Sequence, residues 1–227
     1  MNNVELIQDA NLILDCDEIL VNISPKWTRL LAEHKNEFEE YLDFTEVDKV
    51  KDDHYKLTKL VLNRDKFYLT DWLKKEGVEE IPSHIMKKVM DLYNSKGFYH
   101  DLPLTKMAVG LGKLSYHPSV KKVYVVTRVT DNDANLESKE ALIRSLFPHN
   151  KLDILKVPPK AKKSDYIKDI DIKNGFIFDD ENSNLTDYLV NAKVSECNFY
   201  VPRLGYNRPS IEMLRIADEQ KVSVSYY

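Results

Sequence analysis

Short, uninterrupted apolar runs constrain the fold of this chain most strongly. The clearest three are residues 12–14 (LIL), 123–126 (VYVV) and 176–178 (FIF). Such runs are typical of strands that lie in a parallel sheet and are covered by helices on both faces. Segments with helical spacing separate them, and this alternation predicts a doubly wound, mainly parallel α/β sheet with right-handed crossovers. We expect strands at residues 11–15, 123–126, 152–157, 176–178 and 197–201, and helices at residues 105–116, 135–147 and 210–218.

A long polar and lysine-rich segment interrupts this alternation after the first strand. Ser24-Pro25 is a helix-start signal, and Pro82-Ser83 opens the clearest helix of the segment. From about residue 43 to residue 97 no run has the pattern of a buried parallel strand. We therefore expect two units: an α/β core formed by residues 1–22 and 98–227, and a helical cap formed by residues 23–97.

The low glycine content excludes the common ways of binding a nucleotide through the backbone. The chain has 6 glycines in 227 residues, whereas average usage of about 7% would give roughly 16. No phosphate-binding G-x-x-x-x-G-K-[ST] motif occurs, and the G-x-G that Gly110 and Gly112 begin continues to Ser115 instead of a third glycine. A phosphate group would therefore be bound by side chains, a metal ion or a few helix-end amides.

Charge and cysteine content indicate the compartment and exclude some partners. The formal net charge is −4 and the sequence pI is about 5.9, which gives no general attraction to nucleic acid or to an anionic membrane. No apolar run reaches the length of a membrane-spanning helix, and the first residues lack the pattern of a signal peptide. Two cysteines are too few for a disulfide framework. We expect a cytoplasmic protein without membrane or nucleic-acid partners, and a homodimer is left open.

Polar residues follow three of the apolar runs. Asp15 and Asp17 end the first, Thr127 ends the second, and Asp179-Asp180 ends the third. Ligands of doubly wound sheets bind at the carboxyl ends of the strands, where these residues would meet. A single Asp at such a turn would more simply be a helix N-cap, but D-x-D and D-D together favour a chemical role. Four carboxylates in one cleft repel one another unless a cation is present, and Mg²⁺ prefers such oxygen ligands.

The order of these motifs resembles a known superfamily. The segments LILDCDEIL, VYVVTRV, KAKKSDYI and GFIFDDENSN resemble the haloacid dehalogenase (HAD) superfamily of phosphotransferases, and the resemblance covers roughly residues 10–205. Within it, GFYHDLPLTKMAVGLGKL and NFYVPRLGYNRP resemble segments of the 5′(3′)-deoxyribonucleotidases. The fold that this resemblance implies is a HAD-like Rossmannoid core with a helical cap inserted after the first strand.

The resemblance implies catalytic and metal-binding roles for the aspartates. Asp15 would be the nucleophile that forms an aspartyl-phosphate, and Asp17 would be the general acid and base. Mg²⁺ would be bound by Asp15, by the backbone carbonyl of Asp17, and by Asp179 or Asp180.

The resemblance also implies a set of phosphate-binding residues. Thr127 would hold the phosphate through its hydroxyl, and Arg128 could add a bidentate contact or point to solvent. The lysine that neutralises the phosphate is Lys160, Lys162 or Lys163, and we choose Lys163 because it opens a helical segment.

Two features of this chain add to that picture. Glu18 stands where these enzymes usually have glycine, so an additional carboxylate would lie beside the phosphate pocket. Trp27, Phe44, Tyr68 and Phe98 are candidates for stacking on a nucleobase, although core packing is the simpler explanation for each.

The function that these expectations support is a Mg²⁺-dependent phosphomonoesterase that acts on a small phosphorylated metabolite, most simply a (deoxy)nucleoside 5′-monophosphate. One alternative is a phosphatase for polynucleotide ends. The other, suggested by Glu18, is a HAD-like protein that binds a nucleotide or a partner with little catalysis.

Overall fold

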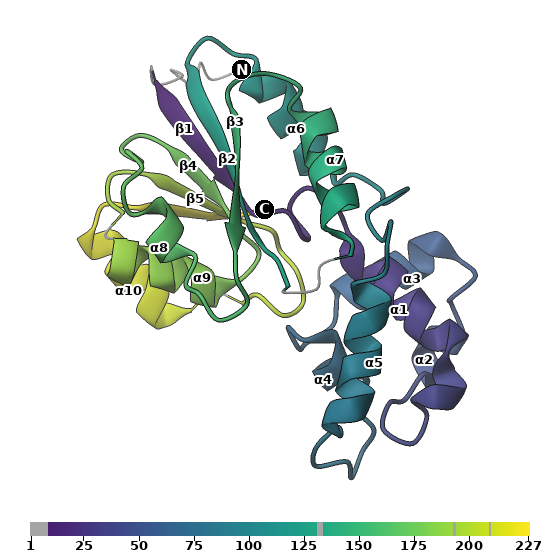
Figure 1. Ribbon diagram of the computed structural model, residues 1–227. Helices are drawn as coiled ribbons and strands as arrows, with labels where there is room; N and C mark the ends of the chain where they lie inside the picture. Colours follow the sequence, from purple (N-terminus) through teal and green to yellow (C-terminus); the bar gives the residue numbers. More distant parts are fainter. Residues whose placement is uncertain (1–8, 131–133, 193, 209) are drawn as a thin grey trace.

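The computed structural model describes residues 9–130, 134–192, 194–208 and 210–227. The first eight residues of the expected core lie outside this description. Within it, six parallel strands form a single sheet in the order β3-β2-β1-β4-β5-β6 (Figure 1). The strands are β1 (Ala10–Leu14), β2 (Val120–Arg128), β3 (Leu152–Val157), β4 (Phe176–Phe178), β5 (Asn198–Val201) and β6 (Ser223–Tyr226).

Helices cover both faces of this sheet, as the continuous apolar strands require. Leu12 and Leu14 pack in one hydrophobic cluster with residues of α6 (Lys106–Ser115) and α7 (Leu136–Leu146). Ile13, which points the opposite way, packs in a second cluster with the helices on the other face. These are α8 (Ser164–Ile167), α9 (Asn182–Asp187), the π-helical turn η2 (Tyr188–Ala192) and α10 (Ile211–Glu219). The prediction of a doubly wound parallel α/β fold is confirmed.

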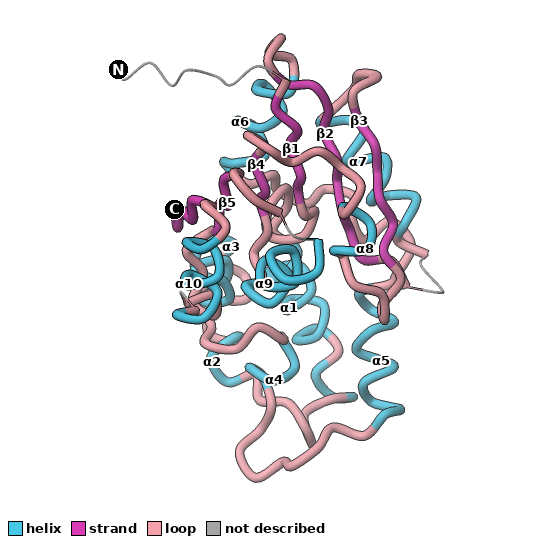
Figure 2. The backbone as a smooth tube through the Cα atoms, turned by 90° about the vertical axis from the view of Figure 1, so that its left-hand side faces the viewer, coloured by secondary structure: helices cyan, strands magenta, loops and turns pink. Residues whose placement is uncertain are grey.

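The segment between β1 and α6 is helical and has a hydrophobic core of its own. Its elements are α1 (Ile23–Glu33), the 3₁₀ turn η1 (Lys35–Glu37), α2 (Thr45–Asp48), α3 (His54–Leu62), α4 (Leu69–Leu73) and α5 (Ser83–Tyr93). Leu31, Leu57, Val61 and Val89 are central to that core. Figures 1 and 2 show these helices beside the ends toward which the strands run. The helical insertion is therefore present, while its division from the core at residues 22/23 and 97/98 stays a prediction.

Several element ends differ from the expectation because tertiary contacts set them. The N-cap of helix α1 is Asn22, two residues before the expected Ser24 cap, and the helix ends at Glu33. Phe38 and Leu42, which continue its apolar spacing, lie in the turns beyond it and are buried in the core of the insertion. Strand β6 was not predicted, because its side chains alternate between half-buried and exposed and form no apolar run.

No helix in the described part of the chain is both long enough and apolar enough to span a membrane.

Candidate active site

The carboxyl ends of the two central strands bring three carboxylates together. Asp15 follows β1, and Asp179 and Asp180 follow β4, which pairs with β1 in parallel register from Leu12–Phe176 to Leu14–Phe178. The backbone N–H of Asp15 donates to the carbonyl of Phe178 at 2.8 Å and continues the pairing past the end of the strand. Each of the three aspartates offers one oxygen within 4.8 Å of the others. Such an oxygen cluster fits a divalent cation.

Lys163 lies against this cluster, at the start of α8. Its ammonium nitrogen is 2.6 Å from Asp15 Oδ2 and 3.0 Å from Asp179 Oδ2, and its side chain is 1% exposed. A lysine is almost never buried to this extent unless it is paired. Lys160 and Lys162, the two other candidates for the phosphate-binding lysine, are exposed. The structure thus brings Lys163 to the candidate nucleophile.

Burial and mutual repulsion perturb the acids of the cluster. The pKa of Asp15 is raised to about 7, because burial and the neighbouring negative charges of Asp179 and Asp17 outweigh the attraction of the Lys163 ammonium. Burial also raises the pKa of Asp180 well above its usual range, and the negative charges of Asp15 and Asp179 add to this effect. Oxygen ligands that lie this close together and whose anionic forms are destabilised are suited to a bound cation.

The two adjacent aspartates differ in their hydrogen bonds. Asp180 Oδ2 accepts a hydrogen bond from the Tyr206 hydroxyl at 2.6 Å, and its other oxygen accepts none from the described residues. Asp179 accepts four, from Lys163 Nζ, the backbone N–H of Glu181, Asn184 Nδ2 and the Tyr188 hydroxyl. Asp180 therefore has the freer oxygen for a metal ion, and Asp179 mainly holds Lys163 and the start of α9.

The side chain of Asp17 is directed to a different set of groups. Its Oδ1 accepts a hydrogen bond from Tyr99 at 2.7 Å, and its Oδ2 accepts from Tyr93 and Lys139, both at 3.1 Å. The two tyrosine hydroxyls are 2.8 Å apart, and the Lys139 ammonium lies 4.9 Å from the centre of the Tyr99 ring. Asp17 is therefore not part of the carboxylate cluster through its side chain, and its expected metal contact through the backbone carbonyl stays a prediction.

The sequence reasoning missed the three residues that hold Asp17. Lys139 is 1% exposed on the side of α7 that packs against the sheet, one turn before the buried Ile143. A lysine on the apolar face of an otherwise amphipathic helix was the signal that could have identified it. Tyr93 and Tyr99 gave no comparable signal, because a tyrosine in a sequence more often packs in the hydrophobic core than binds a carboxylate.

Thr127 and Arg128 end β2 with different surroundings. Thr127 is almost completely buried, and its hydroxyl has no hydrogen-bond partner among the described residues. A buried hydroxyl without a partner near the carboxyl end of a strand next to β1 is available to a bound ligand. The Arg128 guanidinium donates to the carbonyls of Pro159 and Ala161 at 3.2 and 3.0 Å, so it holds the loop that leads to Lys163. The phosphate contacts expected of Thr127 and Arg128 stay predictions.

Glu18 has the backbone conformation that favours glycine. Its φ is 58°, in the left-handed region, which costs an ordinary residue about 1 kcal/mol. Its Oε1 accepts a hydrogen bond at 2.9 Å from the backbone N–H of Ser24 in the first turn of α1. Its Oε2 is buried without a partner in the described structure, and burial raises the pKa of the carboxyl. Glu18 thus stabilises the entry into the inserted helices and places a carboxyl group beside Asp17.

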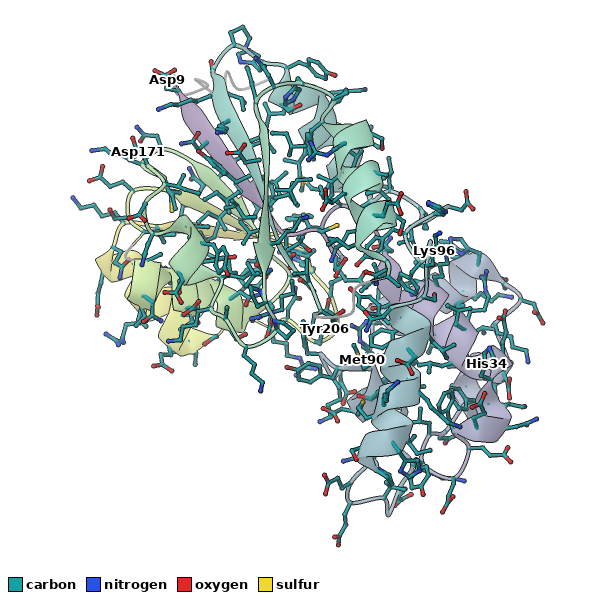
Figure 3. All side chains as sticks on the ribbon, in the orientation of Figure 1. Asp9, His34, Met90, Lys96, Asp171 and Tyr206 are labelled. Carbon is teal, nitrogen blue, oxygen red and sulfur yellow. The ribbon has the colours of Figure 1, made fainter. Side chains whose placement is uncertain are left out.

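A cavity of about 680 Å³ connects these groups with the inserted helices. Its polar side includes Asp15, Lys163 and Asp180, and its apolar side is formed by Trp27, Phe67, Tyr68, Met86 and Met90. Figure 3 labels Met90 on α5 and Tyr206 on the loop after β5, where the helical insertion meets the rest of the molecule. A cavity of this size with one polar end suits a small molecule.

The four aromatic residues considered for base stacking divide into two pairs. Trp27 and Tyr68 line the cavity. Phe44 and Phe98 do not line it and are buried in hydrophobic clusters of the insertion and of the sheet, respectively.

Comparison with known proteins gives similarity of structure alone. No family model and no curated protein matches the sequence. A haloacid dehalogenase-like hydrolase from Burkholderia xenovorans LB400 is 11% identical with a TM-score of 0.48, and the match covers 96% of this chain and 95% of that one. The HAD-hydrolase YfnB from Bacillus subtilis, solved bound to magnesium, is 14% identical with a TM-score of 0.48, over 94% of this chain and 99% of that one. A haloacid dehalogenase-like family hydrolase from Xanthomonas campestris is 12% identical with a TM-score of 0.43, over 97% and 93%.

Proposed function

We propose that this chain is a HAD-type hydrolase, a Mg²⁺-dependent phosphomonoesterase that acts through an aspartyl-phosphate on Asp15. The observation that carries the proposal is the arrangement around Asp15. A buried lysine and two further carboxylates surround it at the polar side of the cavity, and β2 carries a buried, unpartnered threonine hydroxyl near its carboxyl end. This is the set of charges that phosphoryl transfer requires, because its barrier is lowered mainly by positioning and by neutralising charge.

The proposed reaction has two steps. An oxygen of Asp15 attacks phosphorus, and the ester oxygen leaves with a proton from Asp17. Asp17 then takes a proton from the water that cleaves the acyl-phosphate bond and regenerates Asp15. Lys163 and the Thr127 hydroxyl bind the phosphoryl oxygens throughout. Mg²⁺ held by Asp15 and Asp180 would supply the remaining positive charge.

The hydrogen bonds of Asp17 constrain how it can donate a proton. Its Oδ1 accepts one hydrogen bond and its Oδ2 accepts two, so the remaining acceptor position on Oδ1 is where a proton for the leaving oxygen would be carried. Tyr93 is the donor located on the inserted helix α5.

For the substrate we propose a (deoxy)nucleoside 5′-monophosphate. Trp27, Tyr68 and Phe67 line the cavity and offer aromatic surfaces to a base. A cavity of about 680 Å³ is large enough for a mononucleotide. For this substrate we expect a nucleotidase in nucleotide metabolism. Cytoplasmic location belongs to the proposal as well, and a homodimer is left open.

The test is a hydrolysis assay on a panel of phosphate esters with and without Mg²⁺. The panel contains nucleoside 5′- and 3′-monophosphates, p-nitrophenyl phosphate and a 5′-phosphorylated oligonucleotide. We expect Mg²⁺-dependent release of phosphate from the 5′-monophosphates, abolished in Asp15→Asn. Preference for the oligonucleotide would instead support the polynucleotide-end phosphatase. If the folded protein releases phosphate from none of these esters, the proposal is overturned and a non-catalytic binding protein is favoured.

A further inference from the structure

The loop that follows β5 contacts both the inserted helices and the carboxylate cluster. On the side of the insertion, the backbone N–H of Gly205 donates to the carbonyl of Leu62 at 2.9 Å. A Cβ at Gly205 would lie 2.3 Å from the carbonyl oxygen of Asn63 and 2.4 Å from that of Arg64. Two backbones can approach this closely only where one of them is glycine. The loop is thus pressed directly onto the segment between α3 and α4.

The next residue, Tyr206, fixes this contact with its ring. The Arg64 guanidinium lies 4.4 Å from the centre of the ring, and the ring of Phe67 packs edge-on against it at 5.3 Å. Arg64 is itself buried, and it donates to the carbonyls of Val61 and Phe67. Because these three hydrogen bonds orient it, Arg64 presents the face of its guanidinium to Tyr206.

The same loop holds Asp180 on its other side. The hydroxyl of Tyr206 donates to Asp180 Oδ2 at 2.6 Å, and Asn207 Nδ2 donates to the backbone carbonyl of Asp180 at 3.1 Å. Tyr206 is therefore in contact with the inserted segment through its ring and with the candidate metal ligand through its hydroxyl. Among the described hydrogen bonds, the one from Tyr206 is the only bond to the Asp180 side chain.

We propose that Tyr206 is a positioning residue that links the docking of residues 62–67 to the affinity of the site for a divalent cation. This inference rests on the proposed function, because it assumes that Asp180 is a metal ligand. When residues 62–67 are docked, the Tyr206 hydroxyl holds Asp180 in one orientation before a cation arrives. Groups that orient a ligand in this way commonly change metal affinity by about 10- to 100-fold.

The link has a consequence for the inserted helices. Arg64 and Phe67 also line the cavity, so a molecule bound there contacts the segment that packs on Tyr206. If docking strengthens cation binding, cation binding must stabilise docking by the same factor. A bound cation would thus favour the state in which the cavity is closed by this segment.

The experiment measures Mg²⁺ binding without substrate, by isothermal titration calorimetry, in a double-mutant cycle. Tyr206→Phe removes the hydroxyl and keeps the ring, so residues 62–67 stay docked. Phe67→Leu loosens the docking and leaves the hydroxyl in place. Met86→Leu, at a cavity-lining residue of α5, is the control for general disturbance of the insertion. Thermal melts followed by circular dichroism check that each variant is folded.

We expect Mg²⁺ binding to weaken about 10-fold or more in Tyr206→Phe and measurably in Phe67→Leu. In the Tyr206→Phe background, Phe67→Leu should have no further effect, and Met86→Leu should bind like the wild type. Wild-type affinity in Tyr206→Phe would overturn the inference. Equal losses from Phe67→Leu in both backgrounds would also overturn it, because the segment would then not act through the hydroxyl. A wild-type protein that binds no Mg²⁺ would contradict the metal site of the proposed function and, with it, this link.

Discussion

The ammonium nitrogen of Lys163 lies 2.6 Å from Asp15 Oδ2, although the two residues are 148 positions apart in the sequence. The same nitrogen is 3.0 Å from Asp179 Oδ2, so one buried cation faces two buried carboxylates. Burial costs each of these charges its hydration, and only their mutual attraction and hydrogen bonds offset that cost. The position of Lys163 is therefore important for stability as well as for the proposed chemistry.

Replacing Lys163 by methionine should destabilise the protein and abolish hydrolysis. The substitution leaves the buried Asp179 and the nearly buried Asp15 without their shared cation, and breaking a buried pair in this way typically costs about 3–5 kcal/mol. Urea unfolding measures this loss. Lys160→Met is the matched control, because Lys160 is exposed in the same loop and should change the free energy of unfolding by less than about 0.5 kcal/mol. Equal stability of the two variants would contradict the role of Lys163.

Removing the hydroxyl of Tyr99 should affect poor leaving groups more than good ones. Tyr99 donates to Asp17 at 2.7 Å, so Tyr99→Phe leaves the proposed general acid less well oriented. Protonation of the leaving oxygen matters for an alkyl alcohol and hardly matters for p-nitrophenolate. We expect kcat for a nucleoside 5′-monophosphate to fall about 10-fold or more, with little change for p-nitrophenyl phosphate. Equal losses on both substrates would indicate that Tyr99 has a structural role only.

The stability of the metal-free protein should fall as the pH rises toward neutrality. The pKa of Asp15 is raised from 3.8 to about 7 in the folded protein, so the folded state binds a proton more tightly than the unfolded state. The stabilisation from that proton is complete below the unfolded pKa and is lost as the pH rises through the folded pKa. Melting temperatures from pH 4 to pH 8 in a chelator should show this decrease.

Two comparisons isolate the contribution of Asp15 to that pH dependence. Asp15→Asn should show a smaller decrease than the wild type, because its amide does not titrate. Added Mg²⁺ should raise the melting temperature of the wild type mainly at the high-pH end, where the carboxylates are ionised. If the melting temperatures of the wild type and of Asp15→Asn change with pH in parallel, the prediction is contradicted.

Replacing Glu18 by glutamine should stabilise the protein at alkaline pH and leave it unchanged in acid. Burial raises the pKa of Glu18 above its usual range, so ionisation of this carboxyl becomes unfavourable as the pH rises. An amide avoids that cost, and its oxygen can still accept the hydrogen bond from Ser24. Urea unfolding at pH 4 and pH 8 measures the difference, with the exposed Glu39→Gln as control. Equal stabilities of Glu18→Gln and the wild type at pH 8 would contradict it.

The sheet could be predicted from the sequence because its strands are covered on both faces. Such strands need continuous apolar runs. The run at residues 123–126 lies within β2, and the run at residues 176–178 is strand β4. The ends of β1 and β4 could be predicted for the same reason, since a carboxylate such as Asp15 cannot continue a buried run without a partner. Strand β2 instead extends beyond its apolar run on both sides, from Val120 to Arg128. The ends of the short helices in the insertion could not be predicted from the sequence, because the packing of these helices against one another determines where each begins and ends.

The residues around the carboxylates were predictable only in part. Asp15, Asp179 and Asp180 could be placed together because parallel strands bring their ends to one edge. Tyr93 and Tyr99 could not, because they reach Asp17 from separate parts of the chain and nothing in the sequence distinguishes them from core aromatics. Lys139 was recognisable only as a lysine on the apolar face of its helix.

The sequence by itself determined the alternation of buried strands and helices and the carboxylates at the strand ends, because both follow from local burial and from the direction of parallel strands. The tertiary structure decided which oxygens of these carboxylates are free. Asp17 is enclosed by three donors, Asp179 accepts four hydrogen bonds and Asp180 accepts a side-chain bond from Tyr206 alone among the described residues. Such bonds join residues up to 148 positions apart, and only the packing of the sheet, the insertion and the loop after β5 brings them within reach of one another.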